Sequence, residues 1–533
     1  MPTLNRVTQV AYTDQTINFT YDAGTNGVGR LTGASDANHA LSWTYDPLGR
    51  VTGKGLVVGT VTMSMGYGYV NGDLVTLVTP SGQTITYGYT NHQITSVSVN
   101  GAALATNVTY EPFGAVNAWT WGNATTVART YDGDEKITQI STAGDTLSFG
   151  YDNANRITGI TDTNISANSW TLGYDLLDRL NSAAETGTTL GWTYDANGNR
   201  LTQTGSNAST FTPSTTSNKL NSITGSLPRT YSYDAAGDTT GYAGDSFTYN
   251  QRGRMASAAT SSISTSYLYN ALGQMMEKSN SGGATYLMYD EAGHIIGEYS
   301  STGALIEETV WMGDTPIATL QPNGSGITVY YIHSDQLNAP RIITQPSTNT
   351  VAWRWDTDPF GTVAANQNPA GLGNFSYNLR FPGQYYQAET GLNYNYFRDY
   401  DPQTGRYIES DPIGLHGGIN TYVYTADNPV TRIDPSGRGW EMIVVPAAIV
   451  GGGLYLFKHC MDKCQGGNLC AVEQASRARY GSCAGYCFAL SSMWMTLLDG
   501  GFLNTKPPAP SPTSTAETLG TAVDGAPTPS DKP

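Results

Sequence analysis

The sequence predicts an almost entirely β-stranded protein made of repeated hairpins, followed by a C-terminal segment of a different kind. The first observation is composition, since 61 Gly and 35 Tyr stand against only 13% charged residues. Aromatic and β-branched residues suit a pleated sheet, whereas Gly and Asn suit tight turns. The second observation is a short pattern that recurs through most of the chain. The third is an abrupt change of composition after residue 438, which marks the end of the repetitive body.

The recurring unit reads aromatic-x-Tyr-Asp-x-x-Gly-Arg-apolar. Clear copies are WTYDPLGRVTG (43–53), FGYDNANRITG (149–159) and FTYNQRGRMAS (247–257). The central tyrosines include positions 131, 151, 174 and 194, then 233, 249, 269 and 289, so most steps are 20 to 23 residues. One step is about twice as long, which predicts a degenerate copy between Tyr194 and Tyr233.

Each unit is expected to fold as one β-hairpin. Alternating aromatic residues before the aspartate predict a strand with one buried face. The aspartate carboxylate then accepts hydrogen bonds from backbone N–H groups two or three residues on, and glycine supplies the positive φ of the turn. The residues after the arginine form the returning strand. Because an isolated hairpin is only marginally stable in water, neighbouring units are expected to pair edge to edge and to stack their tyrosines.

Through these units, residues 1–438 resemble the YD-repeat proteins of the RHS family, which includes bacterial polymorphic toxins, the C component of insect toxin complexes and the animal teneurins. The resemblance implies a spiral β-sheet that forms a hollow shell over residues 1–300. Residues 301–438 contain YYIHSDQLNAPRIITQ and resemble the RHS-associated core that closes such a shell. His333 and Asp335 within this motif are expected to have structural roles, because no further His or Cys lies nearby at ligand spacing.

Residues 392–438 contain an arginine and two aspartates whose spacing suggests a catalytic site. Asp411 opens the motif DPIGL, eighteen residues follow, and Asp434 then opens DPSGR. Arg398 lies thirteen residues before Asp411. This spacing is similar to that of a self-cleaving device in the toxin branch of the family, so the resemblance implies catalytic roles for Arg398, Asp411 and Asp434. Cleavage just after the second motif would place the junction at Gly437, Arg438 and Gly439.

Elementary electrostatics supports such a device. Two carboxylates held close together cannot both ionise cheaply, so they share a proton and can serve as acid and base on one peptide bond. A neighbouring guanidinium would hold one of them charged and oriented. Asp-Pro-x-Gly is also an ordinary type I turn, so an intact shell with purely structural aspartates stays open as the alternative to a single-turnover aspartyl-type autoprotease. The family motif usually ends in Leu or Trp, and Arg438 departs from it where an apolar side chain would anchor the scissile strand.

The tail is predicted to hold a variable, mainly α domain at 439–505 and a disordered Pro/Thr/Ser/Ala-rich end at 506–533. Two uncharged runs, 442–457 and 481–498, fit either a buried apolar hairpin or one that inserts into a membrane. Cysteine pairs at i, i+4 predict two helices joined by two disulfides, and a zinc site is the lesser alternative. These cysteines are Cys460, Cys464, Cys483 and Cys487. The tail shows no catalytic constellation, and neither a metal nor a cofactor is expected.

The net charge and the first fifteen residues bear on the binding partners and on the route of export. The formal charge of −16 argues against a nucleic-acid partner. Residues 1–15 lack the features of a signal peptide, so export is expected by another route unless the chain is part of a longer protein. The leading hypothesis is a secreted or cell-surface toxin-type shell that encloses its own C-terminal segment, with a delivery machinery and an immunity protein as partners. The alternative is an uncleaved YD-repeat adhesin that binds carbohydrate and whose tail associates with a membrane.

Overall fold

The structure is a computed structural model that describes residues 6–112, 114–142, 144–439 and 441–442. Within these ranges nearly all regular structure is β-strand, and helix is limited to three 3-10 turns. These turns are η1 (Ser166–Asn168), η2 (Gly414–Gly417) and η3 (Thr425–Asp427). The expected all-β shell is therefore confirmed, while the expected α-helical tail, with Cys460, Cys464, Cys483 and Cys487, lies outside the described residues.

The two large sheets form the wall of the shell. The first has 22 strands, and each strand pairs antiparallel with the next along the chain. The strands are β1 (Gln9–Ala11), β2 (Thr16–Tyr21), β3 (Leu31–Ser35), β4 (His39–Tyr45), β5 (Val51–Val58), β6 (Val61–Val70), β7 (Asp73–Val78), β8 (Thr84–Thr90), β9 (Gln93–Val99), β10 (Ala102–Tyr110), β11 (Val116–Trp121), β12 (Thr126–Tyr131), β13 (Ile137–Ser141), β14 (Thr146–Tyr151), β15 (Ile157–Asp162), β16 (Trp170–Tyr174), β17 (Leu180–Glu185), β18 (Thr188–Tyr194), β19 (Arg200–Thr204), β20 (Ser209–Pro213), β21 (Leu220–Gly225) and β22 (Arg229–Thr230).

A second sheet of 13 strands continues the wall, and two small sheets follow. The second sheet comprises β23 (Ser232–Tyr233), β24 (Thr239–Tyr242), β25 (Asp245–Tyr249), β26 (Met255–Ala259), β27 (Ser264–Tyr269), β28 (Met275–Asn280), β29 (Gly283–Tyr289), β30 (Ile295–Ser300), β31 (Leu305–Met312), β32 (Thr315–Asn323), β33 (Gly326–Ser334), β34 (Pro340–Gln345) and β35 (Thr350–Arg354). The small sheets comprise β36 (Tyr385–Gln387), β37 (Leu392–Asn395), β38 (Arg398–Asp401) and β39 (Arg406–Tyr407), then β40 (Arg432–Ile433) and β41 (Glu441–Met442).

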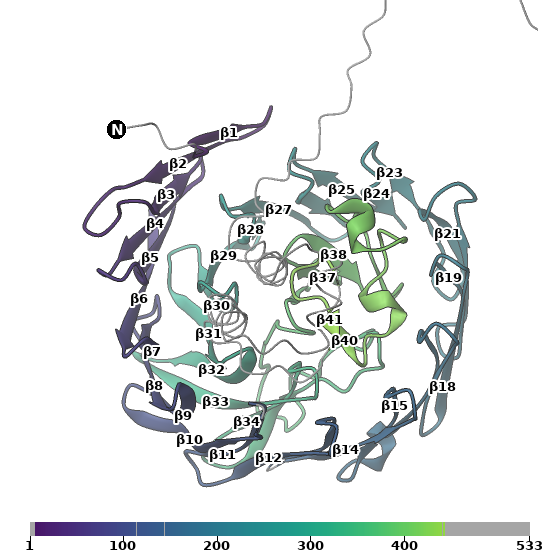
Figure 1. Cartoon of the computed structure of the whole chain (residues 1–533). Helices are drawn as coiled ribbons and strands as arrows, with labels where there is room; N and C mark the ends of the chain where they lie inside the picture. Colours follow the sequence, from purple (N-terminus) through teal and green to yellow (C-terminus); the bar gives the residue numbers. More distant parts are fainter. Residues whose placement is uncertain (1–5, 113, 143, 440, 443–533) are drawn as a thin grey trace, which may run out of the picture.

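The strands follow one another around a ring and then pass inside it (Figure 1). The wall runs from β1 through β12 to β21, and the second sheet carries it on until β30–β33 lie inside the wall made by the early strands. Direct contacts join these two layers. Trp121 of β11 stacks on Tyr331 of β33 with ring centroids 4.4 Å apart, and the Tyr87 hydroxyl donates to the Trp311 carbonyl at 3.0 Å. The overlap makes a closed, two-layered section of wall, as a spiral sheet requires.

The YD turn forms as the sequence predicts, with one refinement. In the unit at β4 and β5, Asp46 Oδ1 accepts from the backbone N–H groups of Leu48 and Arg50 at 2.9 and 3.0 Å. The accepted N–H groups thus lie two and four residues on, whereas two or three was expected. The Arg50 Nε also donates to Asp46 Oδ2 at 2.7 Å, which closes the turn with an ion pair. Gly49 has φ +83°, the conformation that the glycine of the motif was expected to supply.

The tyrosines of the motif link each unit to the preceding one. Each tyrosine hydroxyl donates to a backbone carbonyl about one repeat earlier: Tyr89 to Leu74, Tyr110 to Ile94, Tyr131 to Val116, Tyr151 to Ile137, Tyr174 to Ile157, Tyr194 to Leu180 and Tyr269 to Met255. Arginines of the motif lie over the tyrosine ring of the following unit, as Arg156 does over Tyr174 and Arg179 over Tyr194. Hydrogen bonds and cation–π contacts of the tyrosines therefore join each unit to its neighbours.

The degenerate copy is present where the long step predicted it. Strands β20 and β21 form a hairpin in which Pro213 takes the tyrosine position, opposite Leu220. The next unit is still bound to this copy, because the Tyr233 hydroxyl donates to the Leu220 carbonyl at 2.8 Å. The repeat therefore continues without interruption through this copy.

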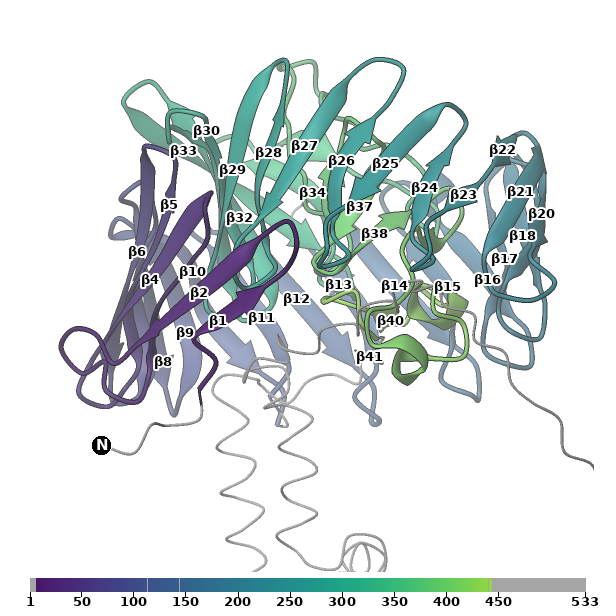
Figure 2. The same cartoon turned by 90° about the horizontal axis from the view of Figure 1, so that it is seen from above.

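The segment after the repeats lies inside the ring. Strands β31–β35 extend the second sheet across residue 301 without a break in strand pairing, so the start of the core at 301 stays a prediction. The four-stranded sheet β36–β39 then packs against the inner side of β23–β28, as Figures 1 and 2 show. One buried cluster joins the two, with Tyr269 and Met275 from the wall and Tyr394 and Tyr400 from the small sheet.

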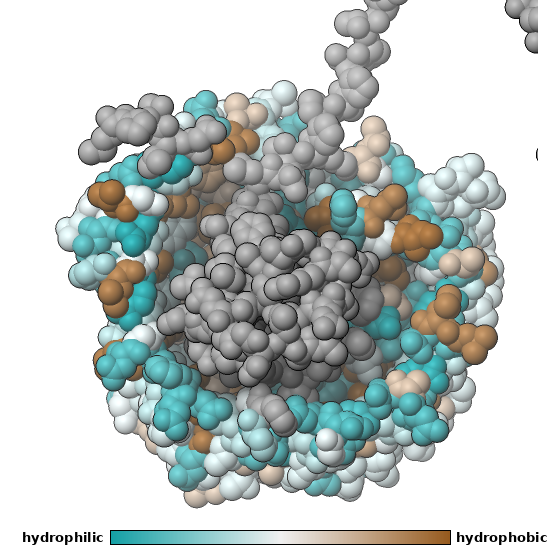
Figure 3. Space-filling model, viewed as in Figure 1, coloured by the Kyte–Doolittle hydropathy of each residue, from teal (hydrophilic) through white to brown (hydrophobic). Residues whose placement is uncertain are grey.

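The visible end of the shell carries no broad apolar face among the coloured residues. Figure 3 shows hydrophobic residues as small patches separated by hydrophilic ones around the rim. Exposed apolar side chains include Val28, Leu48 and Leu176, each in a turn between strands. Within the described ranges, no helix is long and apolar enough to cross a membrane.

Candidate functional site

The three residues predicted from motif spacing meet in the interior of the small-sheet region. Arg398 begins β38, Asp411 precedes η2, and Asp434 follows β40. One nitrogen, Arg398 Nη2, lies 2.9 Å from Asp411 Oδ2 and 3.3 Å from Asp434 Oδ2. All three side chains are buried, each only 2% exposed. A single guanidinium therefore bridges two carboxylates that are far apart in sequence.

Asp434 is held by donors on both oxygens. Its Oδ2 accepts from the Tyr407 hydroxyl at 2.8 Å, in addition to Arg398. Its Oδ1 accepts from the backbone N–H groups of Arg438 and Gly439 at 3.0 and 3.2 Å. Asp434 thus sits against the amide nitrogens on either side of the Arg438 carbonyl.

Asp411 has a different environment. Burial raises its pKa to about 6, against the lowering effects of Arg398 and of the Ile413 N–H, which donates to Oδ1 at 2.9 Å. Its Oδ2 also faces the expected junction. A β-carbon added to Gly417 would collide with Asp411 Oδ2 and would lie 2.9 Å from the Arg438 carbonyl oxygen, so both oxygens border the same small space. A carboxyl group with this pKa can carry a proton next to that carbonyl.

Two further residues complete the site, and the spacing motif did not reveal them. Tyr407 places its ring 3.7 Å from Arg398 Cζ while its hydroxyl binds Asp434. Asn395 Nδ2 donates to the Tyr407 hydroxyl at 2.6 Å and to the Asp434 carbonyl at 2.9 Å. Both residues belong to the tyrosine-rich stretch of β37–β39, where tyrosine and asparagine also fit plain strand packing, so sequence alone offered no signal to single them out.

The junction residues are bound to the same hairpin. Arg398 Nε donates to the Gly437 carbonyl at 2.5 Å. Gly437 has φ +68°, and a β-carbon there would collide with the Asn395 carbonyl oxygen, so this position requires glycine. Arg438 is partly buried, and Gly439 is the last described residue before residue 440. The structure thus brings Gly437, Arg438 and Gly439 to the bridged carboxylates, as the spacing predicted.

A second buried carboxyl pair lies beside the first. The backbone N–H of Asp399 donates to Glu409 Oε2 at 2.7 Å, and both side chains are buried. Burial raises the pKa of Asp399 to about 7 and raises the pKa of Glu409 well above its usual range, with a further contribution from the charge of Asp399. These residues neighbour Arg398 and Asp411 in sequence, so burial raises the pKa of carboxyl groups at two places in the small-sheet region.

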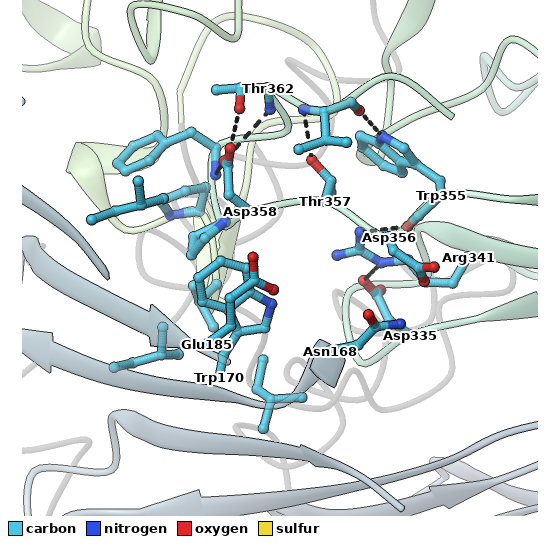
Figure 4. Close-up of a pocket in the computed structure, with 18 of the residues that line it drawn as sticks. Asn168, Trp170, Glu185, Asp335, Arg341, Trp355, Asp356, Thr357, Asp358 and Thr362 are labelled. Carbon is cyan, nitrogen blue, oxygen red and sulfur yellow. Dashed lines mark hydrogen bonds and ion pairs between the residues drawn. The ribbon is translucent and has the colours of Figure 1, made fainter. Parts of the chain in front are cut away.

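One cavity of the shell is separate from these carboxylates. It has a volume of about 430 Å³ and lies between strands β14–β18 of the wall and residues 335–363 (Figure 4). Two of its acidic side chains have partners, since Asp335 Oδ2 pairs with Arg341 Nε at 2.7 Å and Asp358 Oδ1 accepts from the Phe360 N–H at 2.8 Å. None of the three predicted catalytic residues lines it.

The structure gives His333 and Asp335 structural partners. His333 is buried, its Nε2 lies 3.0 Å from Thr344 Oγ1, and burial lowers its pKa to about 4. Asp335 Oδ1 accepts from the N–H groups of Leu337 and Ala339, the turn geometry of the repeats. In the described part of the chain, no group of three or more His, Cys, Asp or Glu residues is arranged to hold a metal.

Comparison with known proteins agrees with the fold and its repeats. The Teneurin YD-shell family model matches residues 51–182 and 145–430. Double-stranded DNA deaminase toxin A of Burkholderia cenocepacia is 40% identical over 121 residues, which are 23% of this chain and 8% of that protein. Toxin protein Tse5 of Pseudomonas aeruginosa is 32% identical over 123 residues, which are again 23% of this chain and 8% of that protein.

Among solved structures, the crystal structure of TcdB2-TccC3-Cdc42 matches with a TM-score of 0.67 and 18% identity. The match covers 79% of this chain and 25% of that chain, and at this identity it concerns the fold alone. The family model extends over most of the described residues and over the repeats on which the resemblance was based. The chain therefore belongs to the Teneurin YD-shell family of RHS/YD-repeat proteins.

Proposed function

We propose that this chain is a toxin-type YD-repeat shell that encloses its own C-terminal segment and releases it by one self-cleavage at the Arg438–Gly439 bond. The observation that carries the proposal is the arrangement of two buried carboxyl groups around this bond. Asp434 Oδ1 accepts from the N–H groups of both Arg438 and Gly439, while Asp411 Oδ2 borders the Arg438 carbonyl. Carboxyl groups on both sides of one peptide bond are what aspartyl-type hydrolysis needs.

Asp434 is the base in this proposal. Arg398 and Tyr407 bind its Oδ2, which leaves Oδ1 facing the bond. Asp434 takes a proton from an attacking water while the water oxygen bonds to the Arg438 carbonyl carbon. When the C–N bond breaks, that proton passes to the Gly439 nitrogen, 3.2 Å from Oδ1. The products are a carboxyl group on Arg438 and an amino group on Gly439.

Asp411 is the acid. With a pKa of about 6, a useful fraction of the protein carries a proton on Asp411 near neutral pH. This proton moves to the Arg438 carbonyl oxygen as water attacks, and the hydroxyl group of the tetrahedral intermediate returns it to Asp411 on collapse. Arg398 stays bound to both carboxyl groups throughout and keeps them at a fixed separation.

The proposed organisation follows the sequence boundaries. Residues 1–300 form the repeat shell, 301–438 the core that cuts, 439–505 the released domain and 506–533 a tail. The toxins among the relatives support a role in delivery of that domain to other cells, with a delivery machinery and an immunity protein as partners. The aligned parts are only 8% of the length of those toxins.

The mass of the purified protein tests the proposal. The wild type is expected to separate into two fragments in denaturing gels, with a new N-terminus at Gly439, whereas Asp411→Asn and Asp434→Asn are expected to stay intact. Asp401→Asn is the matched control, because Asp401 also opens an Asp-Pro turn but pairs with Arg229 rather than with the junction. An intact wild-type chain would refute self-cleavage and favour the uncleaved surface protein.

A further inference from the structure

The turn between β37 and β38 binds the chain segment that carries the junction. Besides the contact from Asn395, the Phe397 N–H donates to the Ser436 carbonyl at 3.2 Å, and Arg398 Nε donates to the Gly437 carbonyl. Backbone carbonyl groups of three residues in the second motif, Asp434, Ser436 and Gly437, thus accept hydrogen bonds from donors of one turn. Tyr396, next to Phe397 in this turn, has φ +56°.

The ring of Phe397 is in contact with two guanidinium groups. Arg438 Cζ lies 3.5 Å from the ring centroid and Arg254 Cζ lies 3.9 Å from it. At these distances each carbon lies close to the ring axis, so two groups cannot share one face and must occupy opposite faces. Arg254 also donates from Nη1 to the Phe397 carbonyl at 2.9 Å, which fixes the ring from the wall side. Arg438 occupies the face that remains.

This contact replaces the expected apolar anchor. The family resemblance led us to expect Leu or Trp where this chain has Arg438. Burial lowers the pKa of Arg438, against the raising effects of Tyr396 and Asp411, so a charged side chain at this place is costly unless further contacts compensate for lost water. The negative face of an aromatic ring provides that compensation for a planar guanidinium, and the same face accepts an apolar or aromatic side chain. It does not favour a carboxylate.

We propose that Phe397, backed by Arg254, is the specificity-determining residue that selects the side chain at position 438 and thereby positions the scissile carbonyl. This inference rests on the proposed self-cleavage. It assigns to Phe397 a site that accepts arginine or a flat apolar side chain and rejects an acidic one. Phe397 touches no reacting atom, so its role is positioning rather than catalysis.

A double-mutant cycle tests the proposal. Phe397→Leu is expected to slow cleavage of the Arg438 protein roughly 2- to 30-fold, the range of a cation–π contact. Phe397→Tyr, which keeps the ring face, is expected to cleave at the wild-type rate.

The second position of the cycle is Arg438. Arg438→Trp is expected to cleave, and Arg438→Lys and Arg438→Glu are expected to cleave more slowly. The decisive result is coupling: Phe397→Leu should slow the Arg438 protein more than it slows Arg438→Glu. An equal factor in both backgrounds would mean that Phe397 only supports folding, and would overturn the proposal.

Phe360→Leu is the matched control, since Phe360 is buried in the same region and lies 4.3 Å from Arg200 Cζ without touching the junction. It is expected to change the melting temperature without coupling to position 438. A second readout does not need self-cleavage. In the Asp411→Asn protein, trypsin should cut after Arg438 several-fold faster when Phe397 is Leu, as mass spectrometry of the fragments can measure. An unchanged rate would overturn the proposal even if the wild type cleaves itself, and a faster rate would support it even if the wild type does not.

Discussion

Tyr407 touches both partners of the ion pair that organises the candidate site. Its hydroxyl donates to Asp434 Oδ2 at 2.8 Å, and its ring lies 3.7 Å from Arg398 Cζ. The hydrogen bond holds the carboxylate, and the ring covers the cation from water. One neutral side chain therefore fixes the distance between two charged ones.

Removing that hydroxyl should slow self-cleavage without unfolding the core. Tyr407→Phe keeps the ring over Arg398 and loses only the hydrogen bond to a charged acceptor, for which a loss of roughly 10- to 100-fold in rate is expected. The measurement is a time course of fragment formation after refolding or synthesis. Tyr400→Phe is the control in the same sheet, because its hydroxyl binds the Phe360 carbonyl instead. Equal rates for Tyr407→Phe and wild type would contradict a role for this hydroxyl.

Cleavage should depend on pH through Asp411. Because the acid must be protonated and its pKa is raised to about 6, the rate should be level below pH 6 and should fall about tenfold for each pH unit above it. Cleavage rates measured from pH 5 to pH 8 in buffers of constant ionic strength would show this decrease. The Asp401→Asn control should keep the same profile. A rate that rises with pH over this range would assign the acid role to another group.

The stability of the small-sheet region should fall as pH rises. Asp399 has a pKa of about 7 in the folded protein and an ordinary value near 4 in the unfolded chain. Because the folded state binds the proton more tightly, this contribution to stability is fully present below about pH 4 and is lost as pH rises through 7. The melting temperature of the wild type should therefore decrease between pH 4.5 and pH 8, and Asp399→Asn should decrease less. Parallel curves for the two proteins would contradict the shift.

Gly417 should be required for cleavage but not for the shell. An added methyl group at this position would collide with Asp411 Oδ2 and crowd the Arg438 carbonyl oxygen. Gly417→Ala is expected to block fragment formation while the purified chain remains folded. Gly133→Ala is the control, because a β-carbon at Gly133 meets no atom within 4 Å. Normal cleavage of Gly417→Ala would show that the two oxygens do not need this space.

The tyrosine hydroxyls of the repeats should contribute to stability in proportion to burial. Tyr269 is buried and donates to the Met255 carbonyl at 2.9 Å, so Tyr269→Phe leaves a buried acceptor unpaired and should cost about 1–3 kcal/mol. Tyr21 makes the same kind of bond to the Val7 carbonyl near the end of the shell, where water can replace it. The melting temperature should fall for Tyr269→Phe and hardly change for Tyr21→Phe. Equal effects would mean that burial does not decide this contribution.

Local chemistry allowed much of the fold to be predicted. A Tyr-Asp turn closes within about five residues, as Asp46 and Arg50 do, so its geometry follows from short-range hydrogen bonds that can be read from spacing. The pairing of each hairpin with the next then leads to a long antiparallel sheet. The same holds for Arg398, Asp411 and Asp434, whose spacing indicated a shared site before any contact was known.

Contacts between distant segments could be decided only by the tertiary structure. Arg254 contacts Phe397, which lies 143 residues later in the chain. This contact depends on where along the spiral β26 comes to lie beside the core. Likewise, Tyr407 and Asn395 look like ordinary strand residues until folding places them beside Asp434. The sequence by itself thus determined the hairpin repeat, the shell class and the three spaced residues, because these depend on local turns and pairing. The side chains that hold Asp434 and Arg438 in place were decided by the packing of the core against the wall, which no local pattern encodes.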